Sequence, residues 1–454
     1  MREQGLPELE RFGPSVRIPE LRDVRLTSRV RAIIDLPDFQ RLRRVRQLGP
    51  THLVYPGATH TRFEHSLGAY GYARRVLVSL LNQAGFRDMV QEQDVLTVLA
   101  GALLHDVGHY PFAHNLEALH RRGRETPRHE DLAGLILQGA IGDELERTWG
   151  VDRERVQRLI QVKHARQPSR LDQVLASILS SAIDVDKMDY LERDSAHLGV
   201  PYGRAFDAGR LIAALTLNEA GDAIAVTAKG KVSAEQFVFS RYMMFSEAYW
   251  HHAVRAASAM IEAAFADFVA RNEPEPDALV ARLLGTGDDA LLQYFYDASP
   301  EGSVSRRLLD GMTGDRRRLH KRVATYSRVY AESEKREAYE RLYALDGAGL
   351  DRVTTRLRTH LAEVTGCELE HGDVLVDTPP RDKDHHETVD VCYPNVRGQG
   401  AYPLHELSHI VAGVHHDFVR VVKKIRVFVC PELATAVRQQ QGRAEEAMMK
   451  AILG

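Results

Sequence analysis

An apolar stretch that ends in a histidine and an aspartate is the feature of this sequence that most constrains its fold. Residues 95–104 read VLTVLAGALL, and Thr97 is the one polar residue among them. A helix that is apolar on all sides belongs in the interior of a protein, and this one is followed directly by His105 and Asp106. Burying an imidazole and a carboxylate is unfavourable unless each has a partner. A metal cation is a partner that satisfies both groups together.

Two further segments supply side chains of the same kinds. His65 stands at the start of a helical pattern that runs to about residue 81, and Asp184 and Asp186 follow a largely apolar stretch at residues 171–183. Two neutral imidazoles and two carboxylates can hold a divalent ion and leave positions for water and phosphate oxygens. The two aspartates point in nearly opposite directions on a helix, and the residues alone leave the choice between them open. The alternative is a histidine and an aspartate that are hydrogen-bonded only to nearby backbone.

Four blocks of the sequence resemble a known family. They are FQRLRRVRQLG at residues 39–49, YPGATHTRFEHSLG at 55–68, HDVGHYPFAH at 105–114 and IDVDKMDYLERD at 183–194. In this order they are similar to the HD-domain metal-dependent phosphohydrolases. The flanks look most similar to the deoxynucleoside triphosphate triphosphohydrolases, both the bacterial HD type and the metazoan SAM-and-HD-domain enzyme. The resemblance extends over about residues 20–270.

The resemblance implies a mainly α-helical fold and an enzyme that hydrolyses deoxynucleoside triphosphates to deoxynucleoside and tripolyphosphate. It also implies four metal ligands, and its motif selects Asp186 over Asp184. The implied ligands are His65, His105, Asp106 and Asp186. Mixed nitrogen and oxygen donors favour manganese, iron, nickel or cobalt, with magnesium as a further candidate.

The same resemblance implies roles for side chains around the metal. The catalytic candidates, on the α-phosphate side of the pocket, are His109, His114, Glu117 and His129. The candidates for binding the triphosphate and the sugar are Gln47, Leu48, Arg62, Lys187, Tyr190, Asp194, Arg241 and Tyr249. Imidazoles titrate near neutral pH, which suits proton transfer to a leaving group. Asp189 and Arg193, by contrast, are interpreted as an i,i+4 ion pair with a structural role.

A second nucleotide site is implied less directly. Asp35, Gln40, Arg41 and Arg43 match positions that bind an activating nucleotide in the metazoan enzyme. The family's His-Gly segment with its effector-binding lysine is not visible at residues 18–26, which read IPELRDVRL, and this departure argues against nucleotide activation. Because effector sites in relatives lie between subunits, the resemblance also implies a homo-oligomer.

Composition limits the other partners. The 454 residues carry 60 lysines and arginines against 63 aspartates and glutamates, a net charge of −3, so no global field attracts nucleic acid or an anionic membrane. The three cysteines lack CxxC spacing and are typical of reduced thiols. The sequence has no long apolar run and no signal-peptide pattern at its start. We therefore expect a cytoplasmic protein.

Changes in pattern along the chain predict four parts. The predicted parts are an N-terminal arm at 1–19, an HD phosphohydrolase domain at 20–270, a helical extension at 271–365 and a small C-terminal α+β unit at 366–454. Residues 1–19 carry little periodicity, and we expect them to be loosely held. Short strands are expected at residues 373–377, 388–392 and 424–430.

A competing metal motif lies in the last part. His405, Glu406 and His409 form an HExxH pattern, and His415 follows ten residues after the first histidine. On one helix face such histidines can bind zinc, with the glutamate as a base. Ala412 stands where the corresponding peptidases have a glycine, and this argues against a peptidase site.

Two other functions are compatible with the sequence. One is an HD hydrolase that acts on another phosphoester, such as a cyclic dinucleotide, a nucleoside monophosphate or single-stranded nucleic acid. That enzyme would release pyrophosphate or orthophosphate instead of tripolyphosphate. The other is a nucleotide-responsive regulatory module without turnover.

Overall fold

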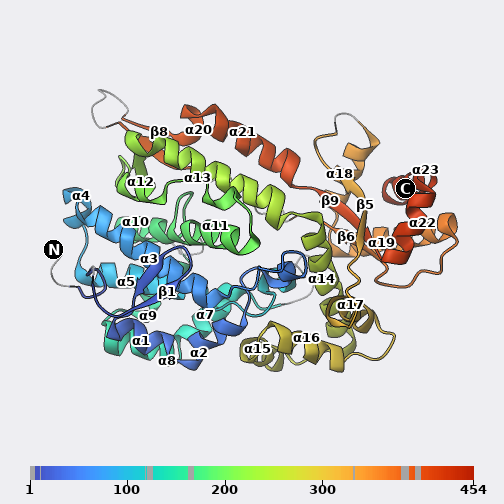
Figure 1. Cartoon of the computed structure of the whole chain (residues 1–454), viewed down its shortest axis with the longest axis horizontal. Coiled ribbons are helices and arrows are strands. Elements are labelled where there is room, and N and C mark those ends of the chain that lie inside the picture. The colour runs from blue at the N-terminus through green and yellow to red at the C-terminus, as the bar shows by residue number, and fades with distance from the viewer. Residues whose placement is uncertain are drawn as a thin grey trace.

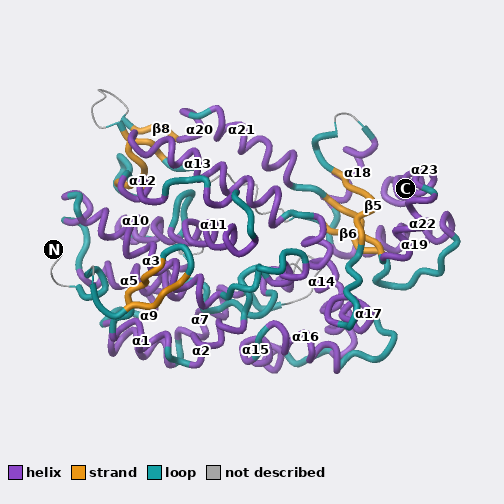
Figure 2. The backbone as a smooth tube through the Cα atoms, in the orientation of Figure 1, coloured by secondary structure: helices purple, strands orange, loops and turns teal. Residues whose placement is uncertain are grey.

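The protein is mainly helical, and short strands make up the rest of its regular structure (Figure 1, Figure 2). The computed structural model describes residues 6–10, 12–117, 119, 126–161, 168–330, 333–379, 388–393 and 400–454. The mainly α-helical fold class predicted from the sequence is confirmed. Within the described part of the chain, none of the helices combines the length and the apolar character that crossing a membrane requires.

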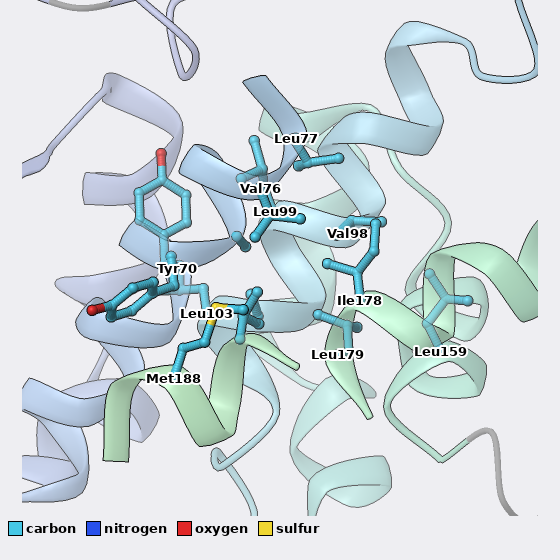
Figure 3. Close-up of a cluster of buried hydrophobic side chains, with 14 of the residues drawn as sticks. Tyr70, Val76, Leu77, Val98, Leu99, Leu103, Leu159, Ile178, Leu179 and Met188 are labelled. Atoms are coloured by element: carbon cyan, nitrogen blue, oxygen red, sulfur yellow. The ribbon is translucent and has the colours of Figure 1, made fainter. Parts of the chain in front are cut away.

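Helices pack on several sides of the apolar stretch. α5 (Glu92–Leu104) contacts α3 (Arg62–Leu81), α9 (Arg153–Ile160) and α10 (Arg170–Leu179), and α11 (Val185–Leu198) contacts α3. All of residues 95–104 are buried, as their composition predicts. Burying an aliphatic side chain of this size contributes roughly 1.5–3 kcal/mol, so the packing around α5 stabilises the first half of the chain. Figure 3 shows the side chains that meet there, among them Val76, Leu77, Val98, Leu99, Leu103, Ile178, Leu179 and Met188.

The ends of three of these helices supply the candidate site. His65 lies in the first turn of α3, and His105 follows the last residue of α5. Asp184 caps α11, because its Oδ1 accepts a hydrogen bond from the backbone N–H of Lys187 at 2.8 Å. A cap of this kind satisfies a backbone donor that the helix leaves unpaired. Asp186 then falls in the first turn of α11, on a different side from the capping residue.

The start of the chain is more ordered than expected. β1 (Ser15–Ile18) and β2 (Arg22–Arg25) form an antiparallel hairpin. Leu6 lies in the main apolar core, and the buried side chain of Glu8 accepts a hydrogen bond from Arg29 at 3.1 Å. The described residues of the predicted N-terminal arm are therefore anchored, which corrects the expectation of a loosely held segment.

The second half of the chain is organised around a long helix. α14 (His252–Asn272) contacts α17 (Val304–Thr313), and Phe265 and Phe268 of α14 pack against Phe295 of α16 (Asp288–Asp297). These aromatic side chains are buried and form a second apolar core.

A three-stranded sheet follows, with the order β5-β9-β6. β9 (Ile425–Val429) pairs with both β5 (Lys321–Tyr326) and β6 (Val374–Asp377), antiparallel in each case. Its apolar residues join those of α19 (Gly347–Thr365) and α23 (Gln441–Leu453) in a third core. In Figure 1 this unit lies at the right-hand end of the molecule, away from α3 and α5.

Strand pairing divides the chain differently from the sequence-based prediction. β5 falls inside the segment expected to be a helical extension. The three segments expected to be strands do contain strands, but β7 (Asp390–Cys392) does not join β6 and β9. It runs parallel to β4 (Ile224–Thr227) in a sheet with the order β3-β4-β7-β8, which includes β3 (Leu215–Leu217) and β8 (Ala401–Pro403). The predicted C-terminal unit is thus split between the two ends of the molecule.

The other α-helices connect these parts. They are α1 (Ser28–Ile34), α2 (Pro37–Gln40), α4 (Ala84–Arg87), α6 (Ala113–Glu117), α7 (His129–Leu137), α8 (Ala140–Glu144), α12 (Ala208–Ala213), α13 (Lys231–Met243), α15 (Pro276–Gly285), α18 (Glu334–Ala344), α20 (Leu404–Leu407), α21 (His409–Asp417) and α22 (Pro431–Gln439).

Candidate active site

The four side chains expected to bind a metal lie together. His65 Nε2 is 3.1 Å from His105 Nε2 and 3.0 Å from Asp186 Oδ1. Asp106 completes the group, with Oδ2 3.7 Å from His65 Nε2 and Oδ1 3.6 Å from His105 Nε2. Such separations match those of donor atoms around one ion with bonds of about 2.0–2.2 Å.

Hydrogen bonds determine which ring nitrogen each histidine presents. His65 Nδ1 lies 2.8 Å from Asp189 Oδ2, and His105 Nδ1 lies 2.9 Å from the carbonyl oxygen of Ala102. Both oxygens accept a proton that is carried on Nδ1, so the Nε2 lone pair of each ring faces the other donors. This is the arrangement that metal-binding histidines adopt.

The carboxylates around His65 favour a positive charge at the centre of the donor group. Burial lowers the pKa of His65, but the carboxylates of Asp186 and Asp189 outweigh it and raise that pKa to about 10. A buried imidazole therefore holds a proton among the ligands when no cation is bound. A divalent ion would supply the charge and displace that proton. The donor types, their spacing and their charge all fit a divalent metal.

A buried ion pair lies behind His65. Arg193 donates from Nε and Nη2 to the two carboxylate oxygens of Asp189 at 2.8 and 2.6 Å, and from Nη1 to Glu64 at 2.5 Å. Asp189 and Arg193 are at most 1% exposed. The predicted i,i+4 pair is present, but sequence reasoning missed the contact of Asp189 with His65. The signal that could have found it is that Asp189 shares a helix face with Asp186.

Two arginines hold the loop after α5. Arg62 Nη1 donates to Asp106 Oδ2 at 2.6 Å, so the residue expected to clamp phosphate also neutralises a ligand. Arg41 donates to the carbonyl oxygens of Val107 and His109, the latter at 2.6 Å. Arg41 is 3% exposed. Its guanidinium is therefore part of the scaffold and not accessible to a nucleotide, which corrects its predicted role at an effector site.

The other residues of that expected site lie nearer the surface. Asp35 and Arg43 are exposed, and Gln40 is partly buried. Gln40 donates to the carbonyl oxygen of Ile34 at 2.7 Å and accepts from Arg43 at 2.8 Å.

The candidate catalytic histidines form a second group beside Asp106. The ring centroid of His109 lies 3.8 Å from that of His129 and 5.0 Å from that of His114. His109 Nδ1 is 3.1 Å from Asp106 Oδ1, which joins the two groups. Glu117 lies 2.7 Å from His129 Nδ1 and 3.7 Å from His114 Nδ1. One carboxylate therefore orients two of the imidazoles.

A polar network marks the side expected to bind the sugar. Tyr249 donates to Asp194 at 2.6 Å, and His60 Nε2 lies 2.7 Å from the other oxygen of the same carboxylate. Gln47 Oε1 is buried and has no hydrogen-bond partner among the described residues. The rings of Tyr190 and Tyr249 are 6.3 Å apart. His60 was not singled out from the sequence, although it lies in the same motif as His65.

The candidate cations gather near Tyr190. Burial raises the pKa of Tyr190 to about 12, and the charges of Arg241 and Lys187 act against that rise. Lys187 Nζ donates to Asp184 at 2.6 Å. Leu48 packs against the main core. Arg241 Nε is buried without a hydrogen-bond partner among the described residues.

The HExxH pattern does not form a zinc-binding helix. α20 ends before Ser408, whose backbone is extended with φ −137° and ψ 111°, and α21 begins after it. His405 and His409 therefore lie on separate helices and not one turn apart on a single face. His405 Nδ1 instead lies 3.1 Å from Thr388 Oγ1.

Comparisons with known proteins agree with this geometry. The model of the HD domain matches residues 62–194, and the model of the HD associated region matches residues 206–448, more than half of the chain. The chain belongs to the HD-domain family. The first match contains all four expected metal ligands.

Individual relatives extend this result. An uncharacterized protein of Bacillus subtilis is 34% identical over 232 residues, which are 50% of this chain and 49% of that protein. The deoxynucleoside triphosphate triphosphohydrolase SAMHD1 of Homo sapiens is 30% identical over 353 residues, 68% of this chain and 55% of that one. The HD-domain chain thus spans about half the length of the curated relatives it matches. A crystal structure of a hypothetical protein from Aquifex aeolicus is 25% identical, with a TM-score of 0.69, and the match covers 94% of this chain and 99% of that one.

Replacing Gly108 by alanine is expected to lower the free energy of unfolding by about 1–3 kcal/mol. In this HD-domain protein a Cβ at Gly108 would overlap the backbone of His129 and Ala133 in α7. Backbone atoms cannot rotate away, so α7 and its histidine would have to move. Urea denaturation measures the change.

Gly413 is the matched control for this substitution. No atom lies within 4 Å of a Cβ at Gly413, which lies in α21. Gly413→Ala is expected to leave stability unchanged or to raise it by about 0.5–1 kcal/mol. Equal stability of the Gly108→Ala variant and the wild type would contradict the close approach of α7 to the loop.

Proposed function

We propose that this HD-domain protein hydrolyses deoxynucleoside triphosphates to deoxynucleoside and tripolyphosphate. The observation that carries the proposal is the convergence of His65, His105, Asp106 and Asp186 directly beside the group of His109, His114 and His129. A metal-ligand set next to proton-carrying imidazoles suits hydrolysis of a phosphoester. The likeness to SAMHD1 supports the choice of substrate.

The metal would be held by the four converging donors. When bound, a divalent ion supplies a Lewis acid for the α-phosphate and lowers the pKa of a bound water. The donor set favours manganese, iron, nickel or cobalt over magnesium.

Side chains of the protein would neutralise the charge of the triphosphate and transfer the proton. Arg62, Lys187 and Arg241 would offset the charge of the triphosphate. His114 would protonate the departing 5′-oxygen. Burial raises the pKa of Glu117, but its hydrogen bonds with His114 and His129 outweigh this and hold it below its usual value. Glu117 thus stays ionised and keeps the imidazoles in place for that proton transfer.

Sugar recognition would use the polar network around Asp194. Its carboxylate is held from one side by His60 and from the other by Tyr249, so it would present a fixed acceptor to a sugar hydroxyl. Gln47 Oε1, buried without a protein partner among the described residues, would be a second acceptor. Leu48 and Tyr190 would pack against the ring.

The test is to incubate metal-stripped protein with each deoxynucleoside triphosphate and Mn²⁺, Fe²⁺, Ni²⁺, Co²⁺ or Mg²⁺ in turn. Ion-exchange chromatography separates the products. Tripolyphosphate together with deoxynucleoside is the expected result. Release of pyrophosphate or orthophosphate would instead support an HD hydrolase acting on another phosphoester. Nucleotide binding without turnover under any of these ions would support a regulatory module.

Assembly and activation belong to the same proposal. We expect a homo-oligomer, and an activating nucleotide would contact Asp35, Gln40 and Arg43. Light scattering tests the assembly, and turnover measured with and without a second nucleotide tests the activation. A monomer whose turnover does not respond to a second nucleotide would contradict them.

His60→Phe is expected to raise KM by about tenfold, because one hydrogen bond to the sugar-binding carboxylate is lost. Phenylalanine can keep the stacked contact with His197, whose ring centroid lies 4.3 Å from that of His60. Asp194 would keep its bond from Tyr249 but would be free to turn. Steady-state kinetics checks the result. A lower melting temperature with unchanged KM would assign His60 a structural role only.

A further inference from the structure

The start of α16 contacts the segment that precedes the candidate sugar-binding residues. A Cβ at Gly287 would lie 2.5 Å from Arg44 Cβ and 2.6 Å from the Arg44 carbonyl oxygen, so the glycine lets the two backbones approach closely. Asp288 Oδ2 accepts a hydrogen bond from the backbone N–H of Arg46 at 3.0 Å. The guanidinium of Arg46 donates to both carboxylate oxygens of Asp289 at 2.9 and 2.8 Å. Three consecutive residues of the HD associated region thus hold residues 44–46, and we call this the α16 contact.

The segment held in this way is bonded to both sides of the proposed substrate site. The backbone N–H of Gln47 donates to the carbonyl oxygen of His60 at 3.0 Å, and that of Arg62 donates to the carbonyl oxygen of Val45 at 2.9 Å. Gln47 is the proposed acceptor for the sugar, and Arg62 is proposed to offset phosphate charge. A displacement of the segment would therefore move groups that hold the sugar and the phosphates.

Asp288 is a buried carboxylate with incomplete hydrogen bonding. Its side chain is 1% exposed, and Arg46 Nη1 lies 3.6 Å from its Oδ2. Asp289, whose side chain is 79% exposed, makes the shorter contact with the same guanidinium. Oδ1 of Asp288 has no hydrogen-bond partner among the described residues. Keeping an ionised carboxylate buried in this state is unfavourable.

The charges around Asp288 bring its ionisation to neutral pH. Burial raises the pKa of Asp288 to about 7, and the charge of Asp289 adds to the rise. The hydrogen bond and the charge of Arg46, and the more distant charge of Arg62, act against it. Burial and the charge of Arg46 lower the pKa of His52, so this neighbour of the same groups is uncharged at neutral pH.

This shift means that ionisation of Asp288 opposes the α16 contact. If α16 separates from residues 44–46, water reaches the carboxyl group, and its pKa falls toward the value of about 4 for a free aspartate. Below that pH the group is neutral whether or not the contact is made. Between that pH and about 7, the contact holds a proton that the separated form releases, so the contact weakens as the pH rises. Above about 7 both forms are ionised, and the contact weakens no further.

We propose that Asp288 is a positioning residue: its neutral carboxyl group keeps α16 on residues 44–46, and its ionisation loosens this contact and lowers the affinity for substrate. The effect on substrate rests on the proposed function, because it acts through Gln47 and Arg62. The α16 contact and its dependence on pH do not rest on that function.

Hydrogen exchange tests the pH dependence without reference to catalysis. The readout is the protection of the Arg46 amide, which donates to Asp288, measured by mass spectrometry of peptides that contain it and corrected for the intrinsic exchange rate. Between about pH 6 and about pH 8, the protection in the wild type should fall about tenfold and level off above about 7. Asp288→Asn keeps the shape and an acceptor for the Arg46 amide but cannot ionise, so its protection should stay constant.

Asp277→Asn is the matched control, because it removes the same charge from an exposed residue in the first turn of α15. This variant should show the same fall as the wild type. Constant protection in the wild type, or an equal fall in Asp288→Asn, would overturn the proposal.

A second variant guards against misfolding of Asp288→Asn. Asp289 is mostly exposed, so Asp289→Asn should leave the fold intact. Its charge raises the pKa of Asp288, and without it the protection should level off at a lower pH than in the wild type. Levelling off at the same pH would contradict the assignment of the effect to Asp288.

Steady-state kinetics separates the positioning role from the proposed function. At saturating Mn²⁺, KM for a deoxynucleoside triphosphate should rise by about twofold or more between about pH 6 and about pH 8 in the wild type, and less in Asp288→Asn. The pH dependence of kcat should be the same in both proteins. If exchange follows Asp288 but KM changes equally in both proteins, the positioning part is wrong. If exchange follows Asp288 and no nucleotide is hydrolysed under any condition, the α16 contact stands and the proposed function fails.

Discussion

Asp106→Asn is expected to lower turnover of deoxynucleoside triphosphates by about 10³-fold or more. Asparagine has nearly the same shape and can still accept the bond from Arg62, so the fold should survive. The substitution removes one negative charge from a group whose two carboxylates, Asp106 and Asp186, would neutralise a divalent ion. It also removes the anion that lies between His105 and His109. We therefore expect both a lower affinity for the metal and a lower rate of hydrolysis.

Three measurements check this expectation together: turnover at saturating Mn²⁺, bound metal per chain, and the midpoint of urea denaturation. Asp351→Asn is the control, because this exposed residue of α19 lies far along the chain from the site and the change in net charge is the same. Turnover within a few-fold of the wild type in Asp106→Asn would remove Asp106 from the ligand set and the metal mechanism with it.

The sequence predicted the first half of the fold because its signals there are local. The ten residues before His105 are apolar except for Thr97, and a helix that is apolar on all sides is expected to be buried in the core. The position of His65 in its motif and the family pattern at Asp186 then indicated which side chains come together. Physics alone left Asp184 and Asp186 undecided. The structure shows the reason: Asp184 caps α11, while Asp186, two residues later in the first turn, faces the histidines.

The groups behind the expected ligands were harder to predict. An aspartate and an arginine four residues apart are explained by an i,i+4 ion pair on one helix. Their spacing therefore gives no reason to expect that Asp189 also contacts His65. Arg41 shows the opposite failure. An arginine-rich turn suggests a surface that meets anions, yet this guanidinium is buried and bonds to two carbonyl oxygens of the loop after α5. Such roles depend on segments far apart in the chain, and no local pattern records them.

The pairing of the strands was hard to predict for a similar reason. Short strands were recognised at β6, β7 and β9, but which strands pair is decided by contacts across long loops. β7 belongs to a different sheet from β6 because it runs parallel to β4 and antiparallel to β8. β5 begins in a charged segment and its burial does not alternate along the strand, so it carries no strand pattern in the sequence, although it pairs with β9 on both sides of a bulge.

Arg193→Met is expected to lower the free energy of unfolding by about 3–5 kcal/mol, because it leaves a buried carboxylate without its partner. Arg193 and Asp189 are at most 1% exposed and share two hydrogen bonds. A Cβ at Gly68 would overlap Asp189 Oδ1 and Arg193 Nη2, so the pair is packed directly against the backbone of α3. Methionine replaces the length of the arginine but none of its donors.

The same variant should also weaken metal binding by about 10–100-fold, as loss of a group that orients a ligand does elsewhere. Without Arg193, Asp189 is free to take up a proton or to turn, and His65 Nδ1 loses a fixed acceptor. Arg271→Met is the matched control: Arg271 forms an i,i+4 pair with Asp267 at 2.9 Å, but its side chain is 49% exposed, so the loss should be at most about 1 kcal/mol with no effect on metal. Denaturation and titration of metal-free protein with Mn²⁺ measure the two effects separately. A large loss of stability with unchanged affinity would show that the pair only supports the core, whereas loss of both would show that the ion pair acts on the metal through His65.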